Sequence, residues 1–236
     1  MSTSPIALAD ATPAELAKAV NTHLKSHAVR VGASEGLRQG VSTGFPVLDA
    51  ATGWNGLPRG QISELIGRPT SGRTATAIRA VASAEGYSAW IDVPGALDVD
   101  HMARLGVDLE RLFILRPEDP GDAPAMAVQL VEGGQFTLVV LDSLGDLAPG
   151  GPTSQTVAQL VRILVPRLGG KPTAMAVLTL PAQHFRSLAH AAALRVSFTQ
   201  TSVIRRGGVL RGWRTRAIVV KGRGKPGAEA GMEIWL

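Results

Sequence analysis

Between residues 61 and 180, short apolar runs alternate with segments that have helical periodicity. Runs such as Phe136–Leu141 are apolar on both faces, which is typical of buried parallel strands. The alternation predicts an α/β fold: a central, mostly parallel sheet with helices on both sides. The predicted strands lie near 61–66, 87–92, 112–115, 136–142 and 174–180, and the predicted helices near 74–85, 98–105, 122–132 and 154–168.

After residue 190 the pattern contains strand-like segments only, near 194–205, 214–221 and 231–235. We expect them to extend one edge of the sheet as antiparallel strands. The core domain would then cover residues 41–236.

Residues 1–40 precede this core as a tail, a helix and a glycine-containing linker. Thr12-Pro13-Ala14-Glu15 predicts a helix start, with Thr12 and Glu15 forming a capping box and Pro13 at the first helical position. The helix would run to about His27 and carry a narrow apolar stripe of Leu16, Val20 and Leu24. Because so short a helix is marginally stable alone, it packs either on its own domain or on another chain.

Composition excludes several classes of protein. The chain has no run of 18 apolar residues and no signal-like amino terminus, so we expect a cytoplasmic protein without a membrane span. It has no cysteine, which excludes disulfides and thiolate chemistry, and its five histidines lack metal-ligand spacing.

The net charge of +5 is unevenly distributed, since residues 194–227 hold nine Lys or Arg and no Asp or Glu. This asymmetry indicates an acidic partner, either nucleic acid or a protein face. Basic residues mixed with aromatic ones suit single-stranded DNA. The alternative is an exposed hairpin whose arginines only keep it soluble. The candidate DNA contacts are Arg195, Arg205, Arg206, Arg211, Trp213 and Arg214.

The stretch Gly67–Thr74 lies between a predicted strand and a predicted helix. It fits the phosphate-loop pattern G-x-x-x-x-G-K-[ST] except that Arg73 replaces the lysine. In such a loop the backbone amides cradle phosphates and the terminal hydroxyl ligates Mg²⁺. The candidate nucleotide-binding residues here are Gly67, Thr70, Ser71, Gly72, Arg73 and Thr74.

A second candidate ligand, Asp142, ends the apolar strand 136–142. Since ligands of open α/β sheets bind at the carboxyl ends of the strands, Asp142 and Thr74 would together hold Mg²⁺. Alternatively, Asp142 only caps the loop after a buried strand.

Several short sequence motifs occur in the order and spacing found in RecA-like recombinases, over nearly the whole chain. They are Val41–Gly44, Leu48–Asp49, Gly56–Ile62, Gly67–Thr74, Trp90–Asp92, Ala96–Asp98, Leu105–Asp108 and Val139–Ser143. The resemblance implies a RecA-like core with ATP or ADP and Mg²⁺ as ligands, and an N-terminal helix that packs on a neighbouring protomer. It also implies that His101 stands where the family packs an aromatic residue on adenine.

The departures from the family concern hydrolysis and DNA binding. Pro94 stands where the resemblance places a glutamate that activates water, and proline has no ionisable group. The two DNA-contacting loops are shortened to about 145–152 and 181–191. Gln183 either matches a glutamine that senses the γ-phosphate or is an ordinary surface residue.

One basic pair is retained. By the resemblance, Lys221 and Arg223 match residues that reach across the protomer interface to the neighbour's ATP, as an arginine finger does. The alternative is a basic pair on an exposed strand that is only solvated.

A short chain with eroded catalytic motifs is similar to the ImuA family, accessory proteins of damage-inducible mutagenic translesion synthesis. That resemblance implies an adaptor in the SOS response with little or no ATP hydrolysis. Its partners would be a RecA recombinase, an ImuB-like inactive Y-family polymerase homologue and a mutagenic C-family polymerase. The alternatives are an active DNA-dependent ATPase or recombinase, and a related cell-division inhibitor.

Overall fold

The computed structural model describes residues 39–142, 153–182 and 185–236. The predicted helix with Leu16, Val20 and Leu24, the loop 145–152 and Gln183 lie outside the described residues. The described residues belong to one compact unit.

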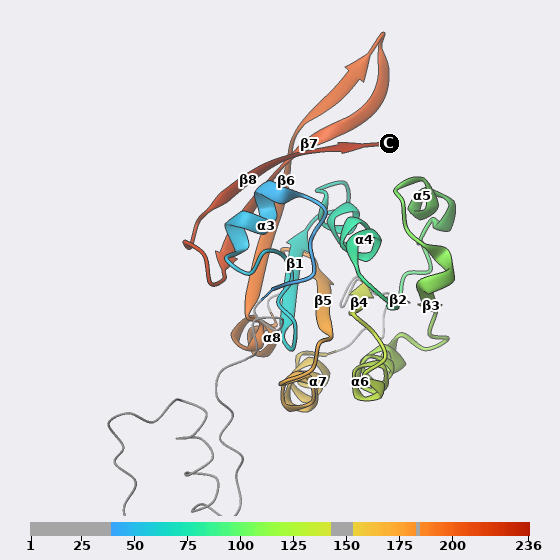
Figure 1. The fold of residues 1–236 in the computed structure, drawn as a ribbon, viewed down its shortest axis with the longest axis vertical. Coiled ribbons are helices and arrows are strands. Elements are labelled where there is room, and N and C mark those ends of the chain that lie inside the picture. Colours follow the sequence, from blue (N-terminus) through green and yellow to red (C-terminus); the bar gives the residue numbers. More distant parts are fainter. Residues whose placement is uncertain (1–38, 143–152, 183–184) are drawn as a thin grey trace, which may run out of the picture. The chain divides into compact units, whose positions relative to one another are not determined.

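Within these residues, eight strands form one sheet in the order β3-β2-β4-β5-β1-β6-β7-β8 (Figure 1). β1 to β6 are mutually parallel, whereas β6–β7 and β7–β8 pair in antiparallel fashion. The predicted mostly parallel sheet with antiparallel strands at one edge is therefore confirmed. The strands are β1 Ile62–Gly67, β2 Ser88–Asp92, β3 Leu112–Leu115, β4 Leu138–Asp142, β5 Ala174–Thr179, β6 Leu194–Arg206, β7 Val209–Lys221 and β8 Glu229–Trp235.

Helices cover both faces of the sheet. The helices are α3 Pro46–Thr52, α4 Arg73–Ser83, α5 Val99–Arg104, α6 Ala123–Gly133, α7 Ser154–Leu168 and α8 Arg186–Ala191, with 3₁₀ turns η1 Leu109–Arg111 and η2 Pro120–Asp122. Alternate residues of the buried strands supply two separate cores, as two-sided burial of parallel strands requires. Leu138 and Val140 of β4 face the α4 side, while Val139 and Leu141 face α6 and α7.

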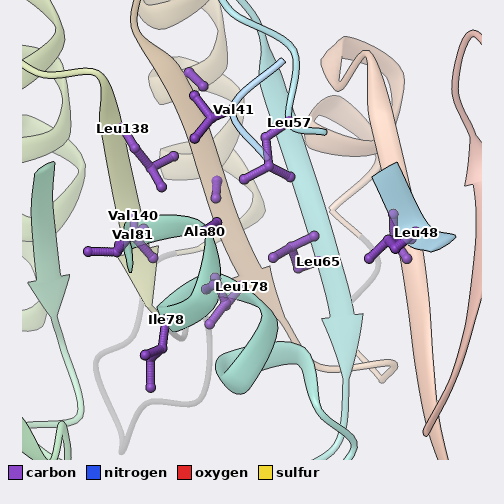
Figure 2. Packing of buried hydrophobic residues seen from close by; sticks show 14 of the residues in the cluster. Val41, Leu48, Leu57, Leu65, Ile78, Ala80, Val81, Leu138, Val140 and Leu178 are labelled. Carbon is purple, nitrogen blue, oxygen red and sulfur yellow. The ribbon is translucent and has the colours of Figure 1, made fainter. Parts of the chain in front are cut away.

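The packing of α4 brings the start of that helix to the end of β1. Ile78, Ala80 and Val81 of α4 lie in one core with Leu65 of β1 and Leu178 of β5 (Figure 2). The small side chains of Ala77 and Ala80 on this helix face allow a close approach to the sheet. Since Leu65 and Leu178 are fully buried, each contributes about 1.5–3 kcal/mol of transfer free energy to this packing.

Three local features differ from the sequence predictions. Helices α3 and α8 were not predicted, and α8 occupies part of the stretch 181–191 that was predicted to be a loop. β7 begins at Val209 rather than near 214, because Gly207 and Gly208 adopt φ of 57° and 79° and close a two-residue hairpin. β6 is antiparallel only to β7 and pairs in parallel with β1.

No helix in the part of the chain that the structure describes is long and apolar enough to cross a membrane.

Candidate nucleotide site

The loop between β1 and α4 is closed by glycine at both ends. A Cβ on Gly67 would clash with Ser71 Oγ, and a Cβ on Gly72 would lie 2.5 Å from Ile234 Cδ1. Gly72 has φ of 98°, and Thr70, at the loop's turn, has φ of 65°. Only glycine adopts the Gly72 conformation without strain. The strand, tight turn and helix start that the sequence predicts for a phosphate loop are therefore present.

Hydrogen bonds fix the loop from within and from a distant strand. Ser71 N–H donates to Arg68 O at 3.1 Å, and the Thr215 hydroxyl of β7 donates to Ser71 O at 2.9 Å. Ile234 of β8 packs against Gly72. The antiparallel edge of the sheet thus holds the loop in place.

Arg73 is the first residue of α4 and is only 4% exposed, whereas the next residue, Thr74, is partly exposed. A planar guanidinium therefore lies buried at the start of the helix, where the phosphate-loop pattern has a flexible ammonium group. The helix N-terminus remains suited to an anion. The partly exposed hydroxyl of Thr74 remains suited to Mg²⁺.

The buried Asp142 ends β4, which is separated from β1 by β5 alone. The parallel strands place its carboxylate and the loop at the same edge of the sheet, as the sequence predicts. Among the described residues, no three His, Cys, Asp or Glu side chains cluster as a metal site. A metal ion here would therefore need oxygen ligands from a bound phosphate in addition to Thr74 and Asp142.

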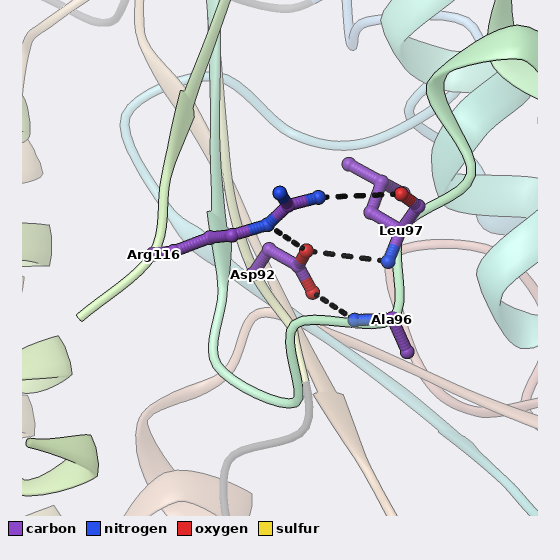
Figure 3. Close-up of polar contacts among 4 residues, drawn as sticks. All are labelled: Asp92, Ala96, Leu97 and Arg116. Atoms are coloured by element: carbon purple, nitrogen blue, oxygen red, sulfur yellow. Dashed lines mark hydrogen bonds and ion pairs between the residues drawn. The ribbon is translucent and has the colours of Figure 1, made fainter. Parts of the chain in front are cut away.

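The turn that contains Pro94 is held by a buried carboxylate at the end of β2 (Figure 3). Asp92 accepts hydrogen bonds from Ala96 N at 3.1 Å, Leu97 N at 3.2 Å and Arg116 Nε at 2.9 Å. Its oxygens are thus occupied in fixing the turn, and residues 93–97 contain no other acidic group. Pro94 is exposed at this edge, and the turn offers no free general base.

His101 lies in α5, where its backbone N–H donates to the capping carboxylate of Asp98 at 2.8 Å. The residue is half-buried. It stays a predicted adenine contact.

Lys221 and Arg223, the retained basic pair, both have partners within the same chain. Lys221 Nζ donates to His190 O at 2.6 Å, at the carboxyl end of α8, where a cation complements the helix dipole. The Arg223 guanidinium lies 4.9 Å from the centre of the Trp54 ring, in a cation–π contact.

The predicted DNA contacts separate into different environments. Arg195 is largely buried in an ion pair with Glu64, which leaves little of it for nucleic acid. Arg214 pairs with Glu233 at 3.0 Å. The remaining predicted contacts lie on the β6–β7 hairpin: Arg205 bonds to Gly208 O, Arg206 lies over Trp235, Arg211 is exposed, and Trp213 is half-buried.

Sequence reasoning did not find Glu64, Arg116 or Thr215. Glu64 could have been noticed as the single acid in an apolar strand, which predicts a buried partner. Nothing in the local sequence of Arg116 or Thr215 indicates their contacts, which join segments far apart in the chain.

The glycine-closed loop after a central parallel strand, with an aspartate ending a nearby strand, defines a phosphate-loop nucleotide-binding fold. The model of the RecA N-terminal domain matches residues 14–168, and the chain therefore belongs to the RecA N-terminal domain family.

Curated relatives are RecA proteins of bacteria. The chain is 36% identical to Protein RecA of Kineococcus radiotolerans over 149 residues, which is 58% of this chain and 43% of that protein. It is 37% identical to Protein RecA of Leifsonia xyli over 150 residues, or 58% and 42% of the two chains. It is 39% identical to Protein RecA of Rhodococcus jostii over 131 residues, or 53% and 37%. The matched region thus spans about two fifths of each relative's length.

Proposed function

We propose that this chain is a degenerate RecA-like adaptor that acts in the SOS response to DNA damage and in mutagenic translesion synthesis, with little or no ATP hydrolysis. The observation that carries the proposal is the turn at Pro94. Its only carboxylate, Asp92, is bound by two backbone amides and Arg116. Phosphoryl transfer to water depends on a positioned nucleophile, and this turn supplies no group to orient one.

The residues of the loop still fit a nucleotide. Backbone N–H groups of the loop other than those at Pro69 and Ser71, together with the start of α4, would hold phosphate, and Thr74 with Asp142 would hold Mg²⁺. Bound ATP would supply the γ-phosphoryl group for transfer. The guanidinium of Arg73, buried at the helix start, would face the negative charge of a bound phosphate without the mobility of an ammonium group. We infer that ATP or ADP is bound as a structural ligand.

The proposed partners are a RecA recombinase, an ImuB-like inactive polymerase homologue and a mutagenic C-family polymerase. Membership in the RecA N-terminal domain family supports the first of these, because related protomers share contact surfaces. The basic pair supports it also, since Lys221 and Arg223 would stabilise charge on a partner's phosphates.

Two measurements on the purified full chain test hydrolysis and nucleotide binding separately. With single-stranded DNA, ATP turnover is expected at background level, against a RecA recombinase measured in parallel. A fluorescent ADP analogue should bind, and Thr74→Val should weaken that binding. Turnover near that of the recombinase would reject the adaptor proposal. It would favour the alternative of an active DNA-dependent ATPase, which is supported by the intact geometry of the phosphate loop.

A third measurement tests the trans role of the basic pair. Binding to recombinase filaments is expected to fall at least about tenfold in the Lys221→Ala, Arg223→Ala double variant, since each lost charge-assisted contact is worth about 1.5–3 kcal/mol. Lys225→Ala removes a neighbouring exposed cation and serves as the matched control. If the double variant binds as tightly as the parent, the pair does not serve a partner's site.

A further inference from the structure

The distal part of the β6–β7 hairpin projects as a two-stranded ribbon beyond β8 (Figure 1). β8 pairs with β7 from Gly212 to Ile218, and Leu236 N–H donates to Arg211 O at 2.9 Å, so the hairpin beyond Arg211 lacks a third strand. The two tip glycines have open space around them. We refer to the segment from Val203 to Arg211 as the hairpin tip; its end, from Arg205 to Leu210, is the two-stranded part.

Three apolar side chains on the hairpin tip are exposed. Val203 is 47% exposed, Val209 is 54% exposed and Leu210 is 41% exposed. Each apolar residue at the end of the ribbon faces an arginine across the strands, since Leu210 pairs with Arg205 and Val209 with Arg206. Exposed aliphatic groups on a projecting element are typical of a protein contact.

The hairpin tip is also strongly basic. Arg205, Arg206 and Arg211 lie on it, and residues 194–228 contain no acidic side chain. Arg205 is held by Gly208 O, and Arg206 lies 5.6 Å from the centre of the exposed Trp235 ring. These contacts restrict the two guanidinium groups, which lowers the entropy lost when a partner carboxylate binds them.

Of the three aromatic residues in β6, β7 and β8 that could stack on bases, Trp235 alone is exposed, and Arg206 already lies over its ring. Phe198 is buried and Trp213 is half-buried in the sheet, so the exposed groups are mainly aliphatic. Single-stranded nucleic acid is recognised by aromatic stacking combined with positive charge, whereas aliphatic groups beside arginine suit a protein surface.

We propose that the hairpin tip docks a partner protein whose contacting surface carries acidic and apolar side chains. The inference rests on the proposed function, because the partners of that adaptor are the proteins with which it is tested. It assigns them a binding surface separate from Lys221 and Arg223, which lie at the other end of β7.

The test uses the full chain and two purified probes, a RecA recombinase filament and the ImuB-like polymerase homologue. One variant, Val209→Thr with Leu210→Thr, removes apolar surface and keeps residues that favour strands. A second, Arg205→Glu with Arg211→Glu, reverses the charge. Matched controls on the exposed side of α7 are Val165→Thr and Arg162→Glu. Circular dichroism and thermal unfolding verify that each variant is folded.

Both hairpin variants are expected to bind at least one probe about tenfold more weakly than the parent, while the controls bind normally. If the parent binds a probe and both variants bind it equally well, the hairpin inference is wrong and the adaptor function stands. If the parent binds neither probe, both proposals fail.

A labelled single-stranded oligonucleotide forms a separate arm of the test. Loss of oligonucleotide binding alone, with protein binding intact, would overturn the inference in favour of a nucleic-acid surface.

Discussion

Replacing Arg195 should destabilise the fold, because this residue neutralises a carboxylate inside the sheet. Glu64 lies in the middle of β1, with Arg195 Nε 2.5 Å from its Oε2 and the Thr179 hydroxyl 3.0 Å from its Oε1. The side chain of Glu64 is 2% exposed and that of Arg195 is 18% exposed. The three residues join the adjacent strands β5, β1 and β6.

The magnitude follows from what Arg195→Met leaves behind. Removing one partner of a buried ion pair costs about 3–5 kcal/mol, since the other charge stays buried. Thr179 still donates to Glu64, and the partial exposure of Arg195 lets water approach the vacated position. We therefore expect the low end, about 3 kcal/mol, which corresponds to a fall in Tm of about 6–12 °C for a chain of this size.

Urea unfolding followed by circular dichroism measures this effect. Adding Glu64→Leu to Arg195→Met removes both charges and should recover most of the loss, because apolar replacement of a buried pair is often close to neutral. Arg205→Met, at an exposed arginine of the same hairpin, is the control and should change stability by less than about 0.5 kcal/mol. A cost below about 1 kcal/mol for Arg195→Met, or a double variant less stable than the single one, would refute the assignment of Arg195 as a structural cation.

Three further substitutions test local contacts by the same unfolding measurement. Arg116→Leu leaves the buried carboxylate of Asp92 with its two amide donors and should cost about 1–3 kcal/mol, and no change would mean that the clamp is not formed. Gly72→Ala places a methyl group against β8 at a residue whose φ is 98°. It should lower the free energy of unfolding by at least about 1 kcal/mol and weaken binding of the ADP analogue. Unaltered stability and binding would contradict the observed loop geometry. Thr153→Ala removes the N-cap of α7, whose hydroxyl accepts from the helix backbone at 3.2 Å, and should cost about 1 kcal/mol, whereas Thr153→Ser should be close to neutral.

The fold could be predicted from sequence where one pattern dominates. The apolar run before Asp142 has a single reasonable structure, a buried parallel strand, and β4 is buried throughout. Helix α7 occupies the predicted residues 154–168, because its apolar stripe runs over four turns. By contrast, α3 and α8 have only seven and six residues, too few for a helical period to emerge from the sequence.

The candidate site likewise contains features that local sequence predicts and contacts that it does not. The loop Gly67–Thr74 was predicted as a unit because its glycine spacing is a local signal, and its geometry agrees. Contacts that close the site from elsewhere were not predicted, since Thr215 reaches Ser71 from 144 residues away. Arg195 was assigned to a DNA-binding surface because residues 194–227 carry only basic charges, although its structural partner is Glu64 in another strand.

The intramolecular contacts of Lys221 and Arg223 affect how a trans role could operate. Both side chains are exposed, so the carbonyl contact of Lys221 contributes about 0.3–1 kcal/mol and the cation–π contact of Arg223 about 0.5–1 kcal/mol. Releasing both would thus cost at most about 2 kcal/mol. Charge-assisted bonds to a partner's phosphates are worth about 1.5–3 kcal/mol each, enough to offset that cost when both form. The cis contacts therefore do not prevent the pair from reaching a partner. They do mean that the two side chains would leave their own chain only for a phosphate that accepts both cations. A partner without a bound nucleotide would therefore leave Lys221 on α8 and Arg223 on Trp54.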